Sequence, residues 1–174
     1  MFAERGFDEV TIDEIAAAVG VSKSTFFRHV PTKEALVIDP LVEGISGVVA
    51  LFEARPSTES VRDALTYAAI ECTREVSTAQ LSVWSQALRT APHLVTRISL
   101  VSDSDRERLI ELATSRLNAN GPDNADHRHA GLVVTIMLAA ASYAFQCWII
   151  DNGKGRESLE EQLQTALRSV SVLP

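Results

Sequence analysis

Hydrogen-bond donors and basic side chains gather in residues 22–30, SKSTFFRHV. Ser22 is placed to cap a short helix, and Pro31 would end it. Phe26 and Val30 are four residues apart and form the inward stripe of this helix. The residues left facing outward or at the edge are Lys23, Ser24, Phe27 and Arg28. Such a face suits a DNA major groove, where base pairs are distinguished by hydrogen bonds and by contacts with thymine methyl groups.

A second short helix is predicted immediately before this one. Thr11 and Glu14 have the spacing of a capping box, in which each side chain accepts a hydrogen bond from the other residue's backbone N–H group. The helix should run to about Val19, and Gly20 suits the left-handed conformation that ends a helix. Two short helices joined by a glycine turn are typical of a helix-turn-helix. Periodicity alone, however, favours a plain helical hairpin within a bundle.

The residues in order add a resemblance that periodicity does not contain. The segment MFAERGFDEVTIDEIAAAVGVSKSTFFRHVPTKEALV resembles the amino-terminal signature of the TetR family of transcription regulators, and it covers about a fifth of the chain. The remainder resembles the family only in its helical pattern. The resemblance implies an all-α fold of about nine helices. It places a helix-turn-helix DNA-binding domain in residues 1–38, with its first helix truncated, and a ligand-binding and dimerisation domain in residues 39–174.

The resemblance also implies which residues contact double-stranded DNA. The candidates are Thr11, Ser22, Lys23, Ser24, Thr25, Phe27, Arg28, His29 and Lys33. Thr11, at a helix N-terminus, and Lys33 are expected to contact phosphate, as is His29. Lys23, with Ser24 and Thr25, is expected to touch bases and nearby backbone.

Two of these positions depart from the family pattern. Ser24 stands where the family usually has glycine, and Phe27 stands where it usually has tyrosine. Phenylalanine keeps the ring for thymine methyl groups but lacks the hydroxyl that hydrogen-bonds phosphate. We therefore expect a lower affinity for DNA.

The charge balance opposes binding to nucleic acid. The chain has a net charge of -7, and residues 1–40 contain four basic and seven acidic side chains. Met1 also stands where the last turn of the family's first helix begins. These two features leave an alternative open: a ligand- or protein-binding helical dimer with a vestigial DNA-binding head.

The rest of the chain has helical periodicity throughout and no sustained strand-type alternation. The fourth helix should start at Thr32 or Lys33 and run to about Glu53, with a kink or break at Asp39–Pro40. Further helices are expected over residues 57–76, 78–90, 92–117, 130–150 and 158–172, and the third of these is predicted to be interrupted near 102–104. The segment 118–126 is expected to be a loop.

The last two helices are predicted to form a homodimer interface. Ala130 to Ile150 is uncharged over a length that crosses a bilayer, but its alanines, its hydroxyls and Gln146 favour a buried bundle helix over a membrane span. The final helix begins with a second capping box, Ser158 to Glu161. Its apolar stripe consists of Leu159, Leu163, Leu167 and Val170. The family dimerises through these helices, although a monomer core would also absorb the stripe; a dimer implies a palindromic operator.

An effector pocket is expected among large or polar-tipped residues of the body. The candidates are Tyr67, Trp84, Leu88, His93, Phe145 and Trp148. Their apolar bias indicates a small apolar effector that releases a repressor from DNA. The segments TFFRHV and CWIIDNG are also faintly similar to actinobacterial regulators that sense acyl-CoA-like or lipidic molecules.

The sequence contains no pattern that predicts an enzyme, a metal site or a cofactor. Asp123, Asp126, His127 and His129 are metal-binding residue types, but they lie in or beside a loop, where solvated side chains are the commoner interpretation. No nucleophile motif is present. Cys72 and Cys147 have no metal-binding spacing, and the first ten residues lack the apolar core of an export signal, so we expect a cytoplasmic protein.

Overall fold

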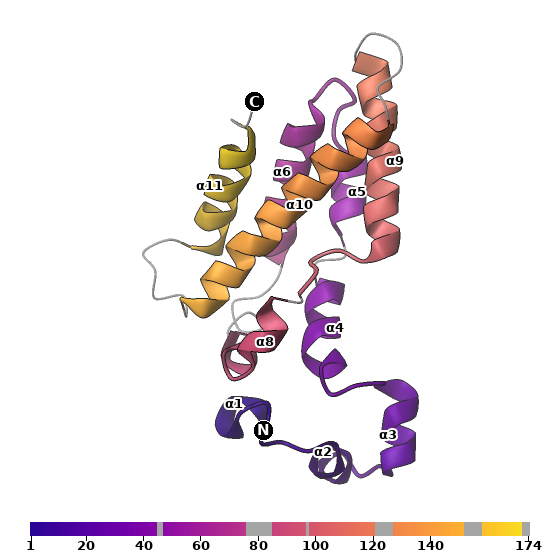
Figure 1. The fold of residues 1–174 in the computed structure, drawn as a ribbon. Coiled ribbons are helices and arrows are strands. Elements are labelled where there is room, and N and C mark those ends of the chain that lie inside the picture. The colour runs from indigo at the N-terminus through magenta and orange to yellow at the C-terminus, as the bar shows by residue number, and fades with distance from the viewer. Residues whose placement is uncertain (45–46, 76–84, 97, 121–126, 152–157, 172–174) are drawn as a thin grey trace.

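The computed structural model describes residues 1–44, 47–75, 85–96, 98–120, 127–151 and 158–171. Within these ranges the labelled elements are ten helices, and no strand occurs, so the all-α prediction is confirmed. The helices are α1 (Phe2–Arg5), α2 (Ile12–Ala18), α3 (Lys23–His29), α4 (Ala35–Gly44), α5 (Val48–Glu53), α6 (Val61–Glu75), α8 (Pro92–Val95), α9 (Asp103–Asn120), α10 (His127–Ile150) and α11 (Leu159–Ser171). Helices α1, α2 and α3 form a head at one end, the helices from α5 onward form the body, and α4 connects the two (Figure 1).

Local hydrogen bonds define the helices of the head. Thr11 and Glu14 form the predicted capping box: the Thr11 N–H donates to Glu14 Oε2 over 2.8 Å, and the Glu14 N–H donates to Thr11 Oγ1. Gly20 follows α2 with a φ of 72°, the left-handed conformation that glycine adopts without strain. Ser22 then caps α3 by accepting a hydrogen bond from the Thr25 N–H. The predicted order of cap, turn and cap is confirmed.

The helix that leaves the head does not break at its proline. Thr32 accepts a hydrogen bond from the Ala35 N–H, and α4 then continues through Pro40 to Gly44. The predicted alternative of a second segment capped by Asp39 is therefore wrong. Proline lacks only its own N–H group, so the neighbouring turns of α4 can keep their hydrogen bonds. A separate helix, α5, begins at Val48.

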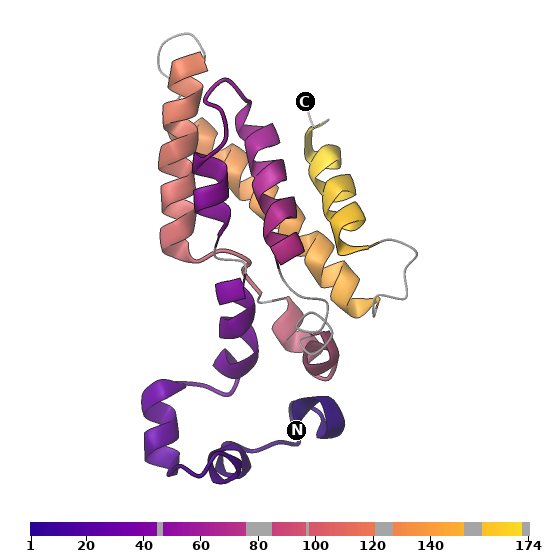
Figure 2. The same ribbon diagram turned by 180° about the vertical axis from the view of Figure 1, so that it is seen from behind.

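The body packs around α10. This helix crosses the layer formed by α5, α6 and α9, as the two opposite views show, and it contacts α6, α9 and α11 (Figures 1 and 2). Its buried residues are Ala130, Val134, Met137, Ala141, Ala144, Phe145 and Ile149. The helix is long and apolar enough to cross a membrane by length and composition alone. Its contacts on three sides are those of a core helix in a bundle.

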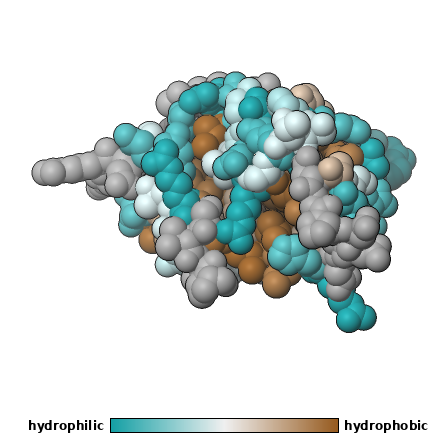
Figure 3. Space-filling view, turned by 90° about the horizontal axis from the view of Figure 1, so that it is seen from above, coloured by the Kyte–Doolittle hydropathy of each residue, from teal (hydrophilic) through white to brown (hydrophobic). Residues whose placement is uncertain are grey.

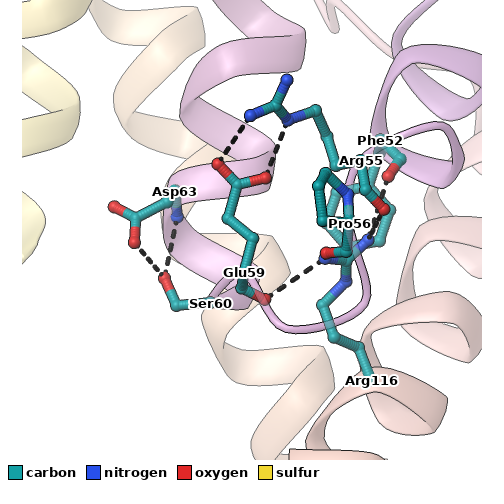
Figure 4. A network of polar contacts seen from close by, with 7 residues as sticks. All are labelled: Phe52, Arg55, Pro56, Glu59, Ser60, Asp63 and Arg116. Carbon is teal, nitrogen blue, oxygen red and sulfur yellow. Dashed lines mark hydrogen bonds and ion pairs between the residues drawn. The ribbon is translucent and has the colours of Figure 1, made fainter.

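One buried arginine fastens α9 to the connection between α5 and α6 (Figure 4). The Arg116 guanidinium donates hydrogen bonds to the carbonyl oxygens of Phe52, Arg55, Pro56 and Glu59. One guanidinium thus draws together four backbone carbonyls at and after the end of α5.

Two further contacts reinforce this region and the last helix. Arg55 forms an ion pair with Glu59, with 2.7 Å between Nε and Oε2. Arg74 of α6 pairs with Glu160 of α11. The predicted second capping box is present at Ser158 and Glu161.

The apolar stripe of α11 lies against its own chain. Leu159, Leu163 and Leu167 are buried, so the monomer core absorbs this stripe. Other hydrophobic side chains reach the surface at the end of the body opposite the head, between hydrophilic ones (Figure 3). In α10 the large exposed hydrophobic residues are Leu132, Tyr143 and Ile150.

Candidate nucleic-acid interface and body cavities

The third helix presents its predicted polar face to solvent. Phe26 is buried on the inner side of α3, and Phe27 is 43% exposed on the other. The remaining exposed residues of this helix are Lys23, Ser24, Arg28 and His29. The predicted division of α3 into an inner and an outer face is therefore confirmed. Its outer face combines cations, a hydroxyl and an aromatic ring on one short, exposed helix.

Hydroxyl groups cluster at the start of α3. The Ser22 oxygen lies 3.0 Å from the Ser24 oxygen and 2.9 Å from that of Thr25. Each hydroxyl is both donor and acceptor, so these groups can exchange partners without leaving a donor unsatisfied. The cluster can thus turn toward an incoming base edge or phosphate.

Two of the basic side chains of the head are held by neighbouring carboxylates. Lys23 Nζ lies 3.0 Å from both carboxylate oxygens of Asp13 in α2. Arg5 pairs with Glu14 at 2.8 Å. The backbone N–H of Thr11, together with the Arg5 guanidinium, lowers the pKa of Glu14 to about 2. Within the described residues of the head, no ion pair involves Arg28, which is exposed.

Lys33 faces the interior of the head. Its ammonium donates to the carbonyl oxygens of Phe7 (2.8 Å) and Val10 (3.1 Å). The same nitrogen lies 4.4 Å from the centre of the Phe7 ring. Lys33 therefore joins the segment before α4 to the turn between α1 and α2. Two of its three N–H groups are engaged, and the third remains for a further acceptor.

The head meets the body at the turn after α1. The Phe7 N–H donates to Thr90 Oγ1 over 2.8 Å, and that hydroxyl donates to the Ala87 carbonyl. The ring of His93, in α8, lies 6.1 Å from the Phe7 ring in an edge-on arrangement. We call this contact between Phe7 of the head and Thr90 and His93 of the body the seam. It could not be predicted from the sequence, because local patterns do not indicate contacts between residues more than eighty positions apart.

Of the six residues predicted to line an effector pocket, the five that the structure describes do not gather at one place. Leu88 and Phe145 are fully buried, and Trp148 stacks on Phe145 with ring centres 6.3 Å apart. His93 belongs to the seam with the head. Tyr67 is exposed, with the Arg55 guanidinium 4.1 Å from its ring centre. Trp84 lies outside the described residues.

Cavities open at several places in the described part of the body. One, of about 240 Å³, lies between the segment 98–106 and α10. A second, of about 150 Å³, lies between α6, α10 and α11, and a third, of about 220 Å³, lies beside Arg116. None of the predicted pocket residues that the structure describes lines these three cavities. The first was missed because its walls come from an irregular segment and a distant helix.

Only two of the four residues of metal-binding type beside the loop lie among the described residues. Asp123 and Asp126 lie outside the described residues. His127 Nδ1 is 3.3 Å from the Thr114 hydroxyl, and His129 is exposed. Among the described residues, no group of three or more His, Cys, Asp or Glu side chains has the arrangement of a metal site.

Similarity to known proteins covers the head in one comparison and nearly the whole chain in another. Residues 1–39 match the family described as "Bacterial regulatory proteins, tetR family". The HTH-type transcriptional regulator TcmR of Streptomyces glaucescens is 25% identical, over 98% of this chain and 77% of that protein.

Two solved structures share the fold. FadR of Thermus thermophilus, described as a TetR-family transcriptional repressor in complex with lauroyl-CoA, is 22% identical with a TM-score of 0.55, over 99% of this chain and 90% of that one. The TetR-family regulator PfmR, also of Thermus thermophilus, is 18% identical with a TM-score of 0.51, over 97% and 91% of the two chains.

The family match spans the segment in which α2 and α3 form the helix-turn-helix, and the helical body behind it aligns with TcmR. The relatives are named as transcriptional regulators, not as enzymes. The amino-terminal head of this chain thus matches the DNA-binding part of the TetR family of bacterial regulatory proteins, and the whole chain has the fold of TetR-family regulators.

Proposed function

We propose that the chain binds a palindromic operator as a homodimer, with α3 of each protomer in a major groove. The observation that carries this proposal is the exposed outer face of α3, set against the buried Phe26. In this assignment residues 1–38 form the DNA-binding domain and residues 39–174 the ligand-binding and dimerisation domain. The two hydrogen-bond donors Lys23 and Arg28 are placed to read base edges or adjacent backbone.

Phosphate contacts would fix the orientation of the head on the duplex. Thr11 is exposed at the start of α2, where backbone N–H groups favour an anion. His29, at the end of α3, is also exposed. Lys33 can offer its remaining N–H group to a phosphate while it holds the turn before α2. The other proposed contacts are Ser22, Ser24, Thr25 and Phe27.

The dimer interface would be centred on α10. Leu132, Tyr143 and Ile150 are 58%, 67% and 64% exposed, and multiples of about 3.6 residues place them on one face of the helix. Because the α11 stripe is already buried, α10 supplies the apolar part of the interface and α11 its edge. A single reading helix rarely gives useful affinity, whereas two heads on paired half-sites do.

A small effector would control DNA binding from the body, and release of a repressor is the mode that we favour. The 240 Å³ cavity lies directly after α8, whose other side meets the head at Phe7. Movement of the segment 98–101 can thus reach the head through α8. FadR, which shares the fold, was solved with lauroyl-CoA bound. Cys72 and Cys147 are not joined in a disulfide, which suits a reducing compartment, and with DNA as its partner the regulator would act in the cytoplasm without a catalytic role.

The test is selection of bound fragments from the native genome, followed by titration of the recovered sequence. We expect an inverted repeat, bound by two protomers. The matched control is Arg108→Gln, an exposed arginine in α9 far along the chain from the head. If no inverted repeat is recovered at low salt, or if the exposed head residues can be replaced without loss of binding, the head is vestigial and the chain acts through its body.

A further inference from the structure

We infer that the 240 Å³ cavity is a binding site for a small carboxylate with an apolar body, and that Arg106 recognises the carboxylate. This inference rests on the proposed control of DNA binding by an effector and specifies the chemical class of that effector. It differs from the purely apolar effector that the sequence predicts, because the cavity contains a cation. The relevant features are the polar groups of the cavity, its apolar walls and its size.

Arg106 is the only charged side chain that lines this cavity in the described structure. Its existing contacts are weak: Nη2 lies 3.4 Å from the Ser99 hydroxyl, and Nη1 lies 3.9 Å from Asp103 Oδ1. Asp103 is almost fully exposed, so water screens this pair. A guanidinium presents five N–H donors, and a carboxylate can accept two in parallel. Most of that capacity is unused here.

Three hydroxyl groups complete the polar lining. Ser99 lies beside Arg106, and Thr135 and Ser142 come from α10. Thr135 and Ser142 are seven residues apart, which places them on one side of that helix. The Ser99 hydroxyl already donates to the Val101 carbonyl, so its oxygen is an acceptor for Arg106 and helps to orient it. The Thr135 and Ser142 hydroxyls can donate to an anion without adding charge.

The remaining walls are apolar. Ile98, Leu100 and Val101 line one side, and Leu138 and Ala139 of α10 line the other. Burial of a hydrocarbon chain against them is favourable, because it removes apolar surface from water. A ligand with a charged end at Arg106 and a hydrocarbon body between these walls satisfies both parts of the lining.

The size of the cavity limits the ligand. A cavity of about 240 Å³ suits a compact molecule, such as a medium-chain fatty acid or an aryl carboxylate. A coenzyme A thioester lacks the free carboxylate that would pair with Arg106.

The experiment is calorimetry of the full chain with octanoate, octanol, octylammonium and octanoyl-CoA. We expect octanoate to bind more tightly than the other three. Arg106→Gln should weaken octanoate binding about tenfold and leave octanol unchanged, since a hydrogen bond to a charged group contributes at least about 1.5 kcal/mol. The matched control is Arg108→Gln, whose guanidinium pairs with Glu53 and Glu111 outside the cavity.

Folding and DNA binding are measured separately. Arg106 is about 40% exposed in the first turn of α9, where loss of a positive charge does not disfavour a helix, so circular dichroism should be unchanged. Operator affinity without ligand should also be unchanged in Arg106→Gln, which separates this inference from the proposed DNA function. Equal binding of octanoate by wild type and Arg106→Gln, or tighter binding of octylammonium or octanoyl-CoA, would overturn the assignment. Absence of octanoate binding by a chain that binds its operator would do the same.

Discussion

Replacing Lys33 by methionine removes the ammonium that joins the start of the fourth helix to the turn before α2. Methionine keeps much of the length and apolar stem of lysine, so the loss is confined to the charged contacts. These are two hydrogen bonds, to the carbonyls of Phe7 and Val10, and one contact with the Phe7 ring. The perturbation therefore isolates one point of attachment inside the head.

The expected loss follows from these contacts. Hydrogen bonds from a charged donor contribute about 1.5 to 3 kcal/mol each, and the low end applies because Lys33 is only half-buried. A partly exposed cation over an aromatic ring adds about 0.5 kcal/mol. The two carbonyls can regain water, which offsets about 1 kcal/mol. We expect Lys33→Met to lower the free energy of unfolding by about 2 to 3 kcal/mol.

Urea denaturation measures this loss, and Lys23→Met is the matched control. Lys23 forms an exposed ion pair with Asp13, and such pairs contribute about 0 to 1 kcal/mol. Hydrogen exchange should become faster at the amides of residues 7–10 in Lys33→Met only. Equal stability of the two variants, within about 0.5 kcal/mol, would refute the internal role of Lys33. The salt dependence of operator binding tests the proposed phosphate contact independently.

Three further predictions concern the neighbouring contacts. Asp13→Asn should strengthen operator binding about fivefold, because it releases Lys23 and removes a charge that repels phosphate. The gain should be clearly smaller when Lys23 is alanine, because only the repulsive part then remains; fluorescence anisotropy measures both, and an equal gain in the two backgrounds would contradict the release of Lys23. Thr90→Val removes the acceptor of the Phe7 N–H. We expect it to reduce the effect of bound effector on operator affinity, while the affinity for effector in the absence of DNA stays constant. If calorimetry shows that the effect on operator affinity is unchanged, this seam has no part in signalling. Glu14 has a depressed pKa of about 2, so its contribution to stability is fully present above about pH 4.5 and is lost as the pH falls through 2. The difference in the free energy of unfolding between wild type and Glu14→Gln should therefore shrink between about pH 6 and about pH 2.5. A constant difference would contradict the capping role.

Local chemistry was predictable from the sequence, and long-range contacts were not. The caps at Thr11, Ser22 and Ser158 follow from side chains that bond N–H groups three residues away, so their spacing is sufficient evidence. Pro40 has a strong local preference, yet the fourth helix continues through it, because the surrounding turns outweigh a single missing hydrogen bond.

The proposed effector site shows most clearly what could not be predicted from the sequence. The aromatic residues predicted to line one pocket, so far as the structure describes them, are distributed between the core, the seam and the surface, because helical periodicity does not fix which helix faces which. Arg106 could not be predicted to line a cavity, since the hydroxyls that share the cavity, Thr135 and Ser142, lie on a helix about thirty residues further along the chain. Lys33 was predicted to face DNA, and only the tertiary structure places its ammonium on the carbonyls of Phe7 and Val10.

The central claim is that α3 of each protomer reads one half of a palindromic operator. Its most direct test is the affinity of wild type and Lys23→Ala for the recovered operator and for every single base-pair substitution in it. The account predicts that Lys23→Ala costs about 1 to 3 kcal/mol and loses base preference at one position in each half-site, placed symmetrically about the centre. A loss of affinity that is uniform across all operators, or no loss at any of them, would contradict the account.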